Sequence, residues 1–117
     1  MQINVNTDDN LRGGASLAAW VEQETKDILA HFTSQLTRVE VHLGDENAGK
    51  SGQMDKRCAI EARAAGMDPV SVTNKGPNVE EACRGALRKL RSVLDSRLGR
   101  RQEHKGAPSI RDETDLA

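Results

Sequence analysis

Aromatic side chains are almost absent from this chain of 117 residues: Trp20 and Phe32 are the only two, and there is no tyrosine. Proteins that read single-stranded RNA by sequence usually stack splayed bases on several aromatic rings. Two aromatic residues do not form such a platform. The composition therefore indicates that any bound nucleic acid is held by its phosphates and its shape.

Long apolar runs are also missing. No stretch approaches the length of a membrane span, and the N-terminus lacks the basic and apolar regions of a signal peptide. We therefore expect a cytoplasmic protein with no membrane partner. Hydrophobic residues make up 36% of the chain and charged residues 30%, a composition typical of one small domain with a modest core.

Cysteine is scarce, with only Cys58 and Cys83. Two cysteines do not form a recognisable metal spacing. Both fall at inward positions of periodic segments, which favours buried thiols over a disulfide in a cytoplasmic protein. The sequence therefore predicts that the two thiols are reduced and lie apart.

Patterns for catalysis are not found in the sequence. His31, His42 and His104 lie on three separate segments, so a shared metal site would need an improbable convergence. The nucleophile elbow of serine hydrolases and the glycine pattern of dinucleotide-binding enzymes are absent. We expect no catalytic residues, no metal, no cofactor and no small-molecule substrate, and hence a protein that is not an enzyme.

The clearest element is an amphipathic helix over residues 78–99. Asn78 and Glu81 have the spacing of a capping box, and Gly99 suits a left-handed residue at the C-terminal end. At about 100° per residue one broad arc is apolar. It contains Val79, Ala82, Cys83, Ala86, Leu87, Leu90, Val93, Leu94 and Leu98.

Charge is distributed unevenly although the net charge is only −1. Residues 1–47 carry three cations against eight acids, whereas residues 84–105 carry eight cations against two acids. On the last helix, a cationic stripe of Arg84, Arg88 and Arg91 follows one shoulder of the apolar arc, and Lys89 lies on the other. Such a stripe is either a solvated face or a contact for an anionic partner, and both interpretations stay open at this point.

Periodicity predicts the order β-α-β-β-β-α. Period-two alternation and turn residues indicate strands at 2–6, 37–43, 55–64 and 69–74. Helical periodicity indicates helices at 16–32, capped by Ser16, and at 78–99. The economical arrangement is an α+β fold with a four-stranded mixed sheet and two helices on one face. The expected core contains Leu17, Val21, Ile28, Phe32, Val41, Ile60, Val72, Leu87, Leu90 and Leu94.

The outer face of this sheet is expected to be polar. A register that pairs Glu40 with Arg63 and His42 with Glu61 would neutralise most of its charge, which favours sheet stabilisation over a ligand site. Residues 1–101 are therefore expected to form one domain. Residues 102–117 have no periodicity and end in acidic residues, which is typical of a disordered tail.

Three passages together resemble the ribosome hibernation-promoting factor family, also called ribosome-associated inhibitor or sigma-54 modulation proteins. They are RVEVHLGDENAGK from Arg38, KRCAIEARAAGMDPVSVT from Lys56, and EEACRGALRKLRSVLDSRLGR from Glu80. The resemblance covers about residues 2–101 and is to the short form, which lacks a separate dimerisation domain. It implies a fold like that of double-stranded RNA-binding domains.

The resemblance also implies a partner, the small ribosomal subunit and its rRNA, in the channel used by messenger and transfer RNA. Members of the family act on translation in stress or stationary phase. Lys89 matches the family's lysine on the second helix, and Arg88, Arg91, Arg97 and Arg100 match neighbouring basic positions.

Two hypotheses follow. The first is a non-enzymatic, ribosome-associated factor that modulates or inhibits translation and contacts rRNA through Arg84, Arg88, Lys89, Arg91, Arg97 and Arg100. The alternative is a protein-interaction module that kept the fold and lost ribosome binding, because the first helix offers only Lys26 among several acids.

Overall fold

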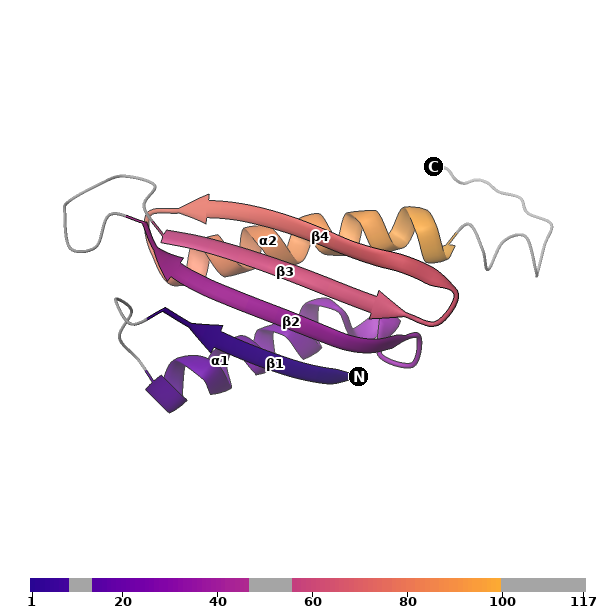
Figure 1. The fold of residues 1–117 in the computed structure, drawn as a ribbon, viewed down its shortest axis with the longest axis horizontal. Helices are drawn as coiled ribbons and strands as arrows, with labels where there is room; N and C mark the ends of the chain where they lie inside the picture. Colours follow the sequence, from indigo (N-terminus) through magenta and orange to yellow (C-terminus); the bar gives the residue numbers. More distant parts are fainter. Residues whose placement is uncertain (9–13, 47–55, 100–117) are drawn as a thin grey trace.

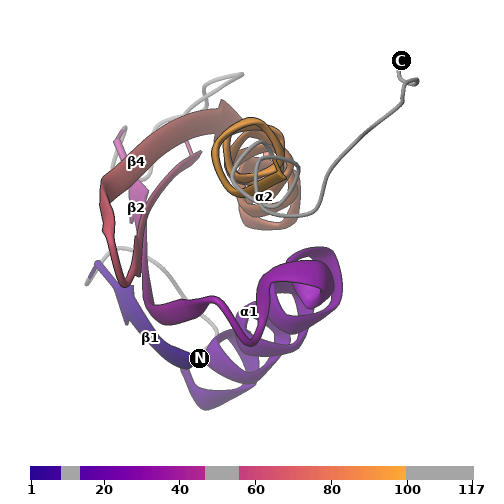
Figure 2. The same cartoon turned by 90° about the vertical axis from the view of Figure 1, so that its right-hand side faces the viewer.

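A four-stranded sheet with both helices on one face forms the protein (Figures 1 and 2). The computed structural model describes residues 1–8, 14–46 and 56–99. The sheet order is β1-β2-β3-β4, with β1 parallel to β2 and the other pairs antiparallel. This confirms the predicted α+β order. The elements are β1 (Gln2–Thr7), α1 (Gly14–Ile28), β2 (Leu36–Asp45), β3 (Lys56–Ala64), β4 (Met67–Gly76) and α2 (Val79–Leu94).

The two ends of α2 differ in how well they were predicted. At its start, the Asn78 side chain accepts a hydrogen bond of 2.8 Å from the Glu81 N–H, which confirms the cap. At its end, the left-handed conformation expected for Gly99 is wrong. The chain instead continues into η2 (Asp95–Gly99), a π-helical turn. Leu98 is thereby kept in the core, with 3% of its surface exposed.

The first helix begins and ends earlier than predicted. It starts at Gly14, so Ser16 lies inside the helix and not at its cap, and it stops at Ile28. The tighter turn η1 (Ala30–Phe32) follows, in which the Phe32 N–H bonds to the Leu29 carbonyl at 2.9 Å. This turn places Leu29 in the core beside Phe32, a position the sequence periodicity missed.

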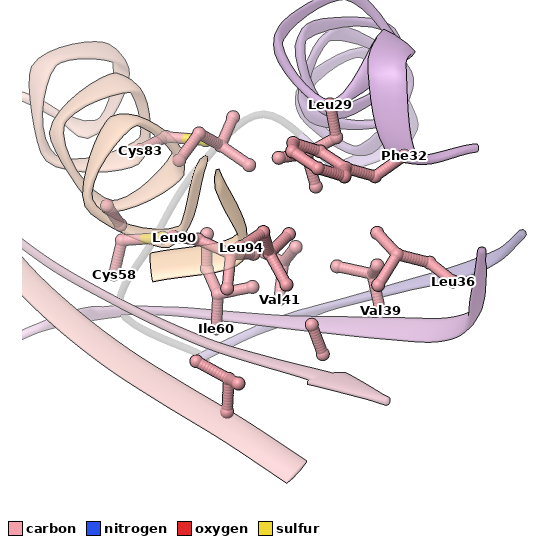
Figure 3. Close-up of a cluster of buried hydrophobic side chains, with 14 of the residues drawn as sticks. Leu29, Phe32, Leu36, Val39, Val41, Cys58, Ile60, Cys83, Leu90 and Leu94 are labelled. Carbon is pink, nitrogen blue, oxygen red and sulfur yellow. The ribbon is translucent and has the colours of Figure 1, made fainter. Parts of the chain in front are cut away.

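Most of the predicted core is confirmed (Figure 3). The buried members are Val21, Phe32, Val41, Ile60, Leu87, Leu90 and Leu94. Leu17, Ile28 and Val72 are only partly buried, at the edge of the cluster. The core also contains Leu29 and Leu36, which lie where an element ends or begins and where periodicity carries little information.

Small residues let α2 approach β4 closely. A Cβ atom at Gly76 would lie 2.8 Å from the Ala82 nitrogen, and one at Gly85 would collide with the Asn74 side chain. The Asn74 amide uses this space to donate a hydrogen bond of 3.2 Å to the Ala82 carbonyl. The start of α2 is therefore fixed against the sheet, and this sets the direction in which its outer face points.

Both cysteines are fully buried and free, as predicted, but they are neighbours and do not lie apart. Cys58 on β3 and Cys83 on α2 form a side-chain hydrogen bond, and this bond together with burial raises the pKa of the Cys58 thiol. A raised pKa lowers the thiolate fraction, which is the reactive form.

We expect neither thiol to react with a disulfide reagent in the native protein, because both are inaccessible and Cys58 is protonated. Absorbance at neutral pH should show two thiols reacting within minutes in denaturant and almost none without it. Rapid reaction of either thiol in the folded protein would contradict the burial of the pair.

The outer face of the sheet has a register different from the predicted one. Glu40 lies opposite Glu61, and Arg38 lies opposite Arg63, after an irregularity between Leu36 and Arg38. The predicted pairings Glu40–Arg63 and His42–Glu61 are therefore wrong by two residues. A shift of two keeps the same side chains facing the core, so the alternation cannot distinguish these registers.

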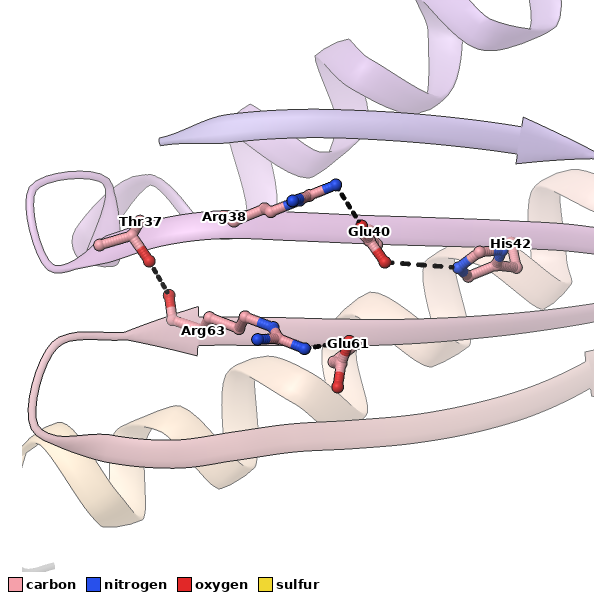
Figure 4. Close-up of polar contacts among 6 residues, drawn as sticks. All are labelled: Thr37, Arg38, Glu40, His42, Glu61 and Arg63. Atoms are coloured by element: carbon pink, nitrogen blue, oxygen red, sulfur yellow. Dashed lines mark hydrogen bonds and ion pairs between the residues drawn. The ribbon is translucent and has the colours of Figure 1, made fainter.

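Arginines and glutamates in one part of this face pair along each strand (Figure 4), while Arg57 and Lys75 both pair with Glu46. Arg38 pairs with Glu40, and Arg63 pairs with Glu61, each two residues away on its own strand. The Nε2 atom of His42 lies 3.8 Å from the Oε1 atom of Glu40. A surface of alternating, paired charges is poorly suited to a polyanion.

Candidate nucleic-acid interface

The cationic stripe of α2 faces the side on which α1 lies. The apolar arc of α2 packs on the sheet, and Arg84, Arg88 and Arg91 stand exposed beside it. The Arg84 side chain reaches two residues of α1, Glu24 and Trp20, so this flank of α2 faces α1. Three positively charged side chains therefore follow one another over about 10 Å of helix.

Arg84 is occupied by contacts within the protein. Its Nε donates to the Glu24 carboxylate at 3.1 Å, and its guanidinium lies 5.2 Å from the centre of the Trp20 ring. An exposed ion pair of this kind contributes at most about 1 kcal/mol. Glu24 nevertheless offsets the charge of Arg84 and competes with any external anion.

Arg88 and Arg91 are available to a ligand, and we call them the arginine pair. Within residues 1–8, 14–46 and 56–99, neither makes an ion pair. Together with Ser92 and Asp95 they line a shallow hollow of about 230 Å³. The arginine pair is thus the part of the stripe whose charge is least offset.

The other three predicted site residues are placed differently. Lys89 lies on the opposite flank of α2, where its Nζ donates a hydrogen bond of 2.9 Å to the Thr73 carbonyl of β4. Arg97 is exposed on η2, beyond the arginine pair. Arg100 lies outside the described residues, as does the segment 102–117 for which the sequence predicts disorder. Within α2, the structure therefore places Arg84, Arg88 and Arg91 on one flank and Lys89 on the other.

Sequence reasoning missed Glu24 and Trp20 as neighbours of the stripe. They are four residues apart on α1, the spacing that puts two side chains on one helix face. Helix α1 also carries Glu22 and Asp27, and the sequence did not indicate which of its acids would meet α2. That depends on how the two helices pack, which periodicity does not specify.

The histidines do not gather into a metal site in the described part of the chain. No group of three His, Cys, Asp or Glu side chains is close enough there to hold a metal ion. His31 and His42 lie on η1 and β2, and His104 is outside the described residues. None of the described helices is long and apolar enough to cross a membrane.

Glu24→Gln is expected to strengthen binding of an RNA duplex, because it removes the carboxylate that competes for Arg84. If Arg84 then contacts one more phosphate, the log–log salt dependence should steepen by about 0.9. Fluorescence anisotropy with a labelled duplex at several salt concentrations measures both quantities. Stability should change by less than about 1 kcal/mol.

Glu22→Gln is the matched control for this substitution. It makes the same change in charge on the same helix, but Glu22 pairs with Lys26 and not with α2. Equal gains in affinity from both variants would show that only net charge matters and that Glu24 has no specific effect on Arg84.

The fold and this flank define a class of small α+β domain, with a mixed four-stranded sheet and a cationic helix on its covered face. Solved structures share this arrangement of sheet and helices. The N-terminal domain of Thermus thermophilus Protein Y superposes with a TM-score of 0.65 at 20% identity, over 82% of this chain and 98% of that one. A ribosomal subunit interface protein from Coxiella burnetii superposes with a TM-score of 0.69 at 10% identity, over 85% and 99%.

At these identities the likeness is one of fold. The sequence itself matches no family model and no curated protein. The match covers 98% and 99% of the two solved chains, so this chain matches almost the whole fold of each.

Proposed function

We propose that this protein is a ribosome-associated factor that binds rRNA of the small subunit through phosphates, without catalysing a reaction. It would thereby modulate or inhibit translation in the cytoplasm under stress or in stationary phase. The observation that carries the proposal is the arginine pair, exposed and without ion partners in the described structure, on a fold shared with a ribosomal subunit interface protein.

The chemistry of the flank supports this role. A guanidinium group binds a phosphate through two parallel N–H donors and keeps its charge at any physiological pH. Arg88 and Arg91 are about one helical turn apart, so they present two such groups on one side of α2. Arg97 and Arg100 follow in the sequence, and in this proposal they extend the same contact.

The alternative function is a protein-interaction module, and one observation favours it. The flank of α1 that meets the stripe contributes Glu24, which offsets Arg84, and exposed Glu22 and Asp27 lie on the same helix. An acidic helix beside a cationic one suits a basic protein partner better than a polyanion.

Sedimentation of the full chain with purified ribosomal subunits tests the proposal. We expect the protein to travel with the small subunit through a sucrose gradient at low salt, and to be released as salt is raised. Retention at the top of the gradient at low salt, with the protein folded, would contradict ribosome binding and would favour the protein-interaction module.

A further inference from the structure

A second hollow lies where the starts of the two helices come together. It has a volume of about 470 Å³, within the range of small-molecule pockets. From α1 it is lined by Ser16, Leu17 and Trp20, and from the start of β3 by Lys56. The rest of the lining lies at and just before the start of α2: Pro77, Asn78, Val79 and Glu80. We call it the Trp20 hollow.

Trp20 connects this hollow to the cationic stripe. Its indole ring lines the hollow, and the guanidinium of Arg84 lies 5.2 Å from the ring centre. The Nε of Arg84 also donates to the Glu24 carboxylate at 3.1 Å, so Arg84 contacts both residues of α1 at once. Because Arg84 is the first residue of the stripe, the hollow lies at the end of the stripe where α2 begins.

The lining suits a flat heterocycle. Leu17, Val79 and the Trp20 ring supply apolar surface, and the two charged residues of the lining are of opposite sign, Glu80 and Lys56, of which Lys56 pairs with Asp45 at 3.5 Å. The lining also offers both hydrogen-bond donors and acceptors. The side-chain oxygen of Asn78 accepts the hydrogen bond of the helix cap, so its amide N–H groups remain as donors. The Glu80 carboxylate is an acceptor.

We propose that the Trp20 hollow binds one unpaired purine base of RNA, stacked on the Trp20 ring, while neighbouring phosphates contact the cationic stripe. The inference rests on the proposed RNA-binding function and adds a base subsite to it. Although the sequence excludes a platform of several aromatic rings, one indole beside an arginine is sufficient for a single base. Stacking contributes about 1–3 kcal/mol per base, which equals about 5- to 150-fold in affinity.

Trp20 reports on its own hollow, because it is the only tryptophan and the chain has no tyrosine. The full chain is titrated with hexa-adenylate and with a hexamer of the same charge whose ribose units lack bases. We expect the adenylate to quench the tryptophan fluorescence and to bind about 5- to 150-fold more tightly than the abasic hexamer. Equal affinity and equal fluorescence response for the two hexamers would overturn the proposal.

Two variants separate the base subsite from the phosphate contacts. Ser16→Phe fills the hollow from an exposed position, so it should remove the preference for adenylate and leave the affinity for the abasic hexamer unchanged. Arg88→Ala should weaken both hexamers by the same factor and keep the preference. If Ser16→Phe keeps the preference while a melt shows that it is folded, the base does not enter the hollow.

A blocked tripeptide, acetyl-Gly-Phe-Gly-amide, tests for a protein side chain as the occupant. Quenching by this tripeptide at lower concentration than by hexa-adenylate would overturn the proposal in favour of a protein partner. Failure of the base preference while the protein still sediments with small subunits would reject only the base subsite. Loss of sedimentation itself would reject the proposed function.

Discussion

Replacement of both Arg88 and Arg91 by alanine is expected to weaken binding to small subunits and to flatten its dependence on salt. If each side chain neutralises one duplex phosphate, the log–log slope should fall by about 0.9 per residue, or about 1.8 for the pair. Between roughly 50 and 200 mM salt, the advantage of the wild-type protein should then shrink about tenfold. Sedimentation or anisotropy across this range measures the effect.

The fold is expected to survive this double substitution. Both side chains are exposed on α2, and neither has an ion partner in the part of the chain that the structure describes. Alanine also has the highest helix propensity. A thermal melt should therefore change little, within about 0.5 kcal/mol.

A matched control is the double substitution Arg38→Ala and Arg63→Ala on the outer face of the sheet. It removes the same charge from the face opposite to the helices, where each arginine already pairs with a glutamate. If this control flattens the salt dependence as much as the α2 variant does, the effect comes from net charge alone. The arginine pair would then be only a solvated face.

Leu90→Ala is expected to cost about 2–5 kcal/mol of unfolding free energy. Leu90 is fully buried between α2 and the sheet, with 0% of its surface exposed (Figure 3). Its truncation removes apolar contacts and leaves a cavity that the surrounding strands can only partly close. In a domain of this size the melting temperature should fall by at least about 8 °C.

Leu17→Ala is the matched control, because Leu17 is only partly buried at the edge of the core. The same truncation should cost clearly less there, since part of the side chain is already in water. Urea unfolding of both variants gives the comparison. Equal losses, or a loss at Leu90 below experimental error, would show that the core is not centred under α2.

Sequence patterns predicted the elements and the face that each one buries, because both follow from local periodicity. Val41 and Ile60 alternate with polar neighbours, and Leu87, Leu90 and Leu94 recur at helical spacing, so their burial could be read directly. Leu29 and Leu36 were missed because they lie at a turn and at a strand start. At such positions tertiary packing, and not periodicity, determines which side chain is buried.

The cationic stripe could be predicted from spacing alone. Which of its arginines are paired within the protein and which are not could not be predicted. Whether Arg84 is free or paired depends on Glu24, which is 60 residues away in sequence and meets it only through helix packing. The register of Glu40 against Glu61 was missed for a related reason. A long-range alignment by two residues leaves every local pattern unchanged.

The contact between Lys89 and Thr73 has a consequence for how copies of this protein meet. β4 is an outer strand of the sheet, and an outer strand is a template on which another chain can add. With a net charge of −1, molecules of this protein repel one another little. A strand that adds along β4 must first displace the Lys89 ammonium from the Thr73 carbonyl and bury a charge beside it. Lys89 therefore disfavours fibre-like growth along this edge.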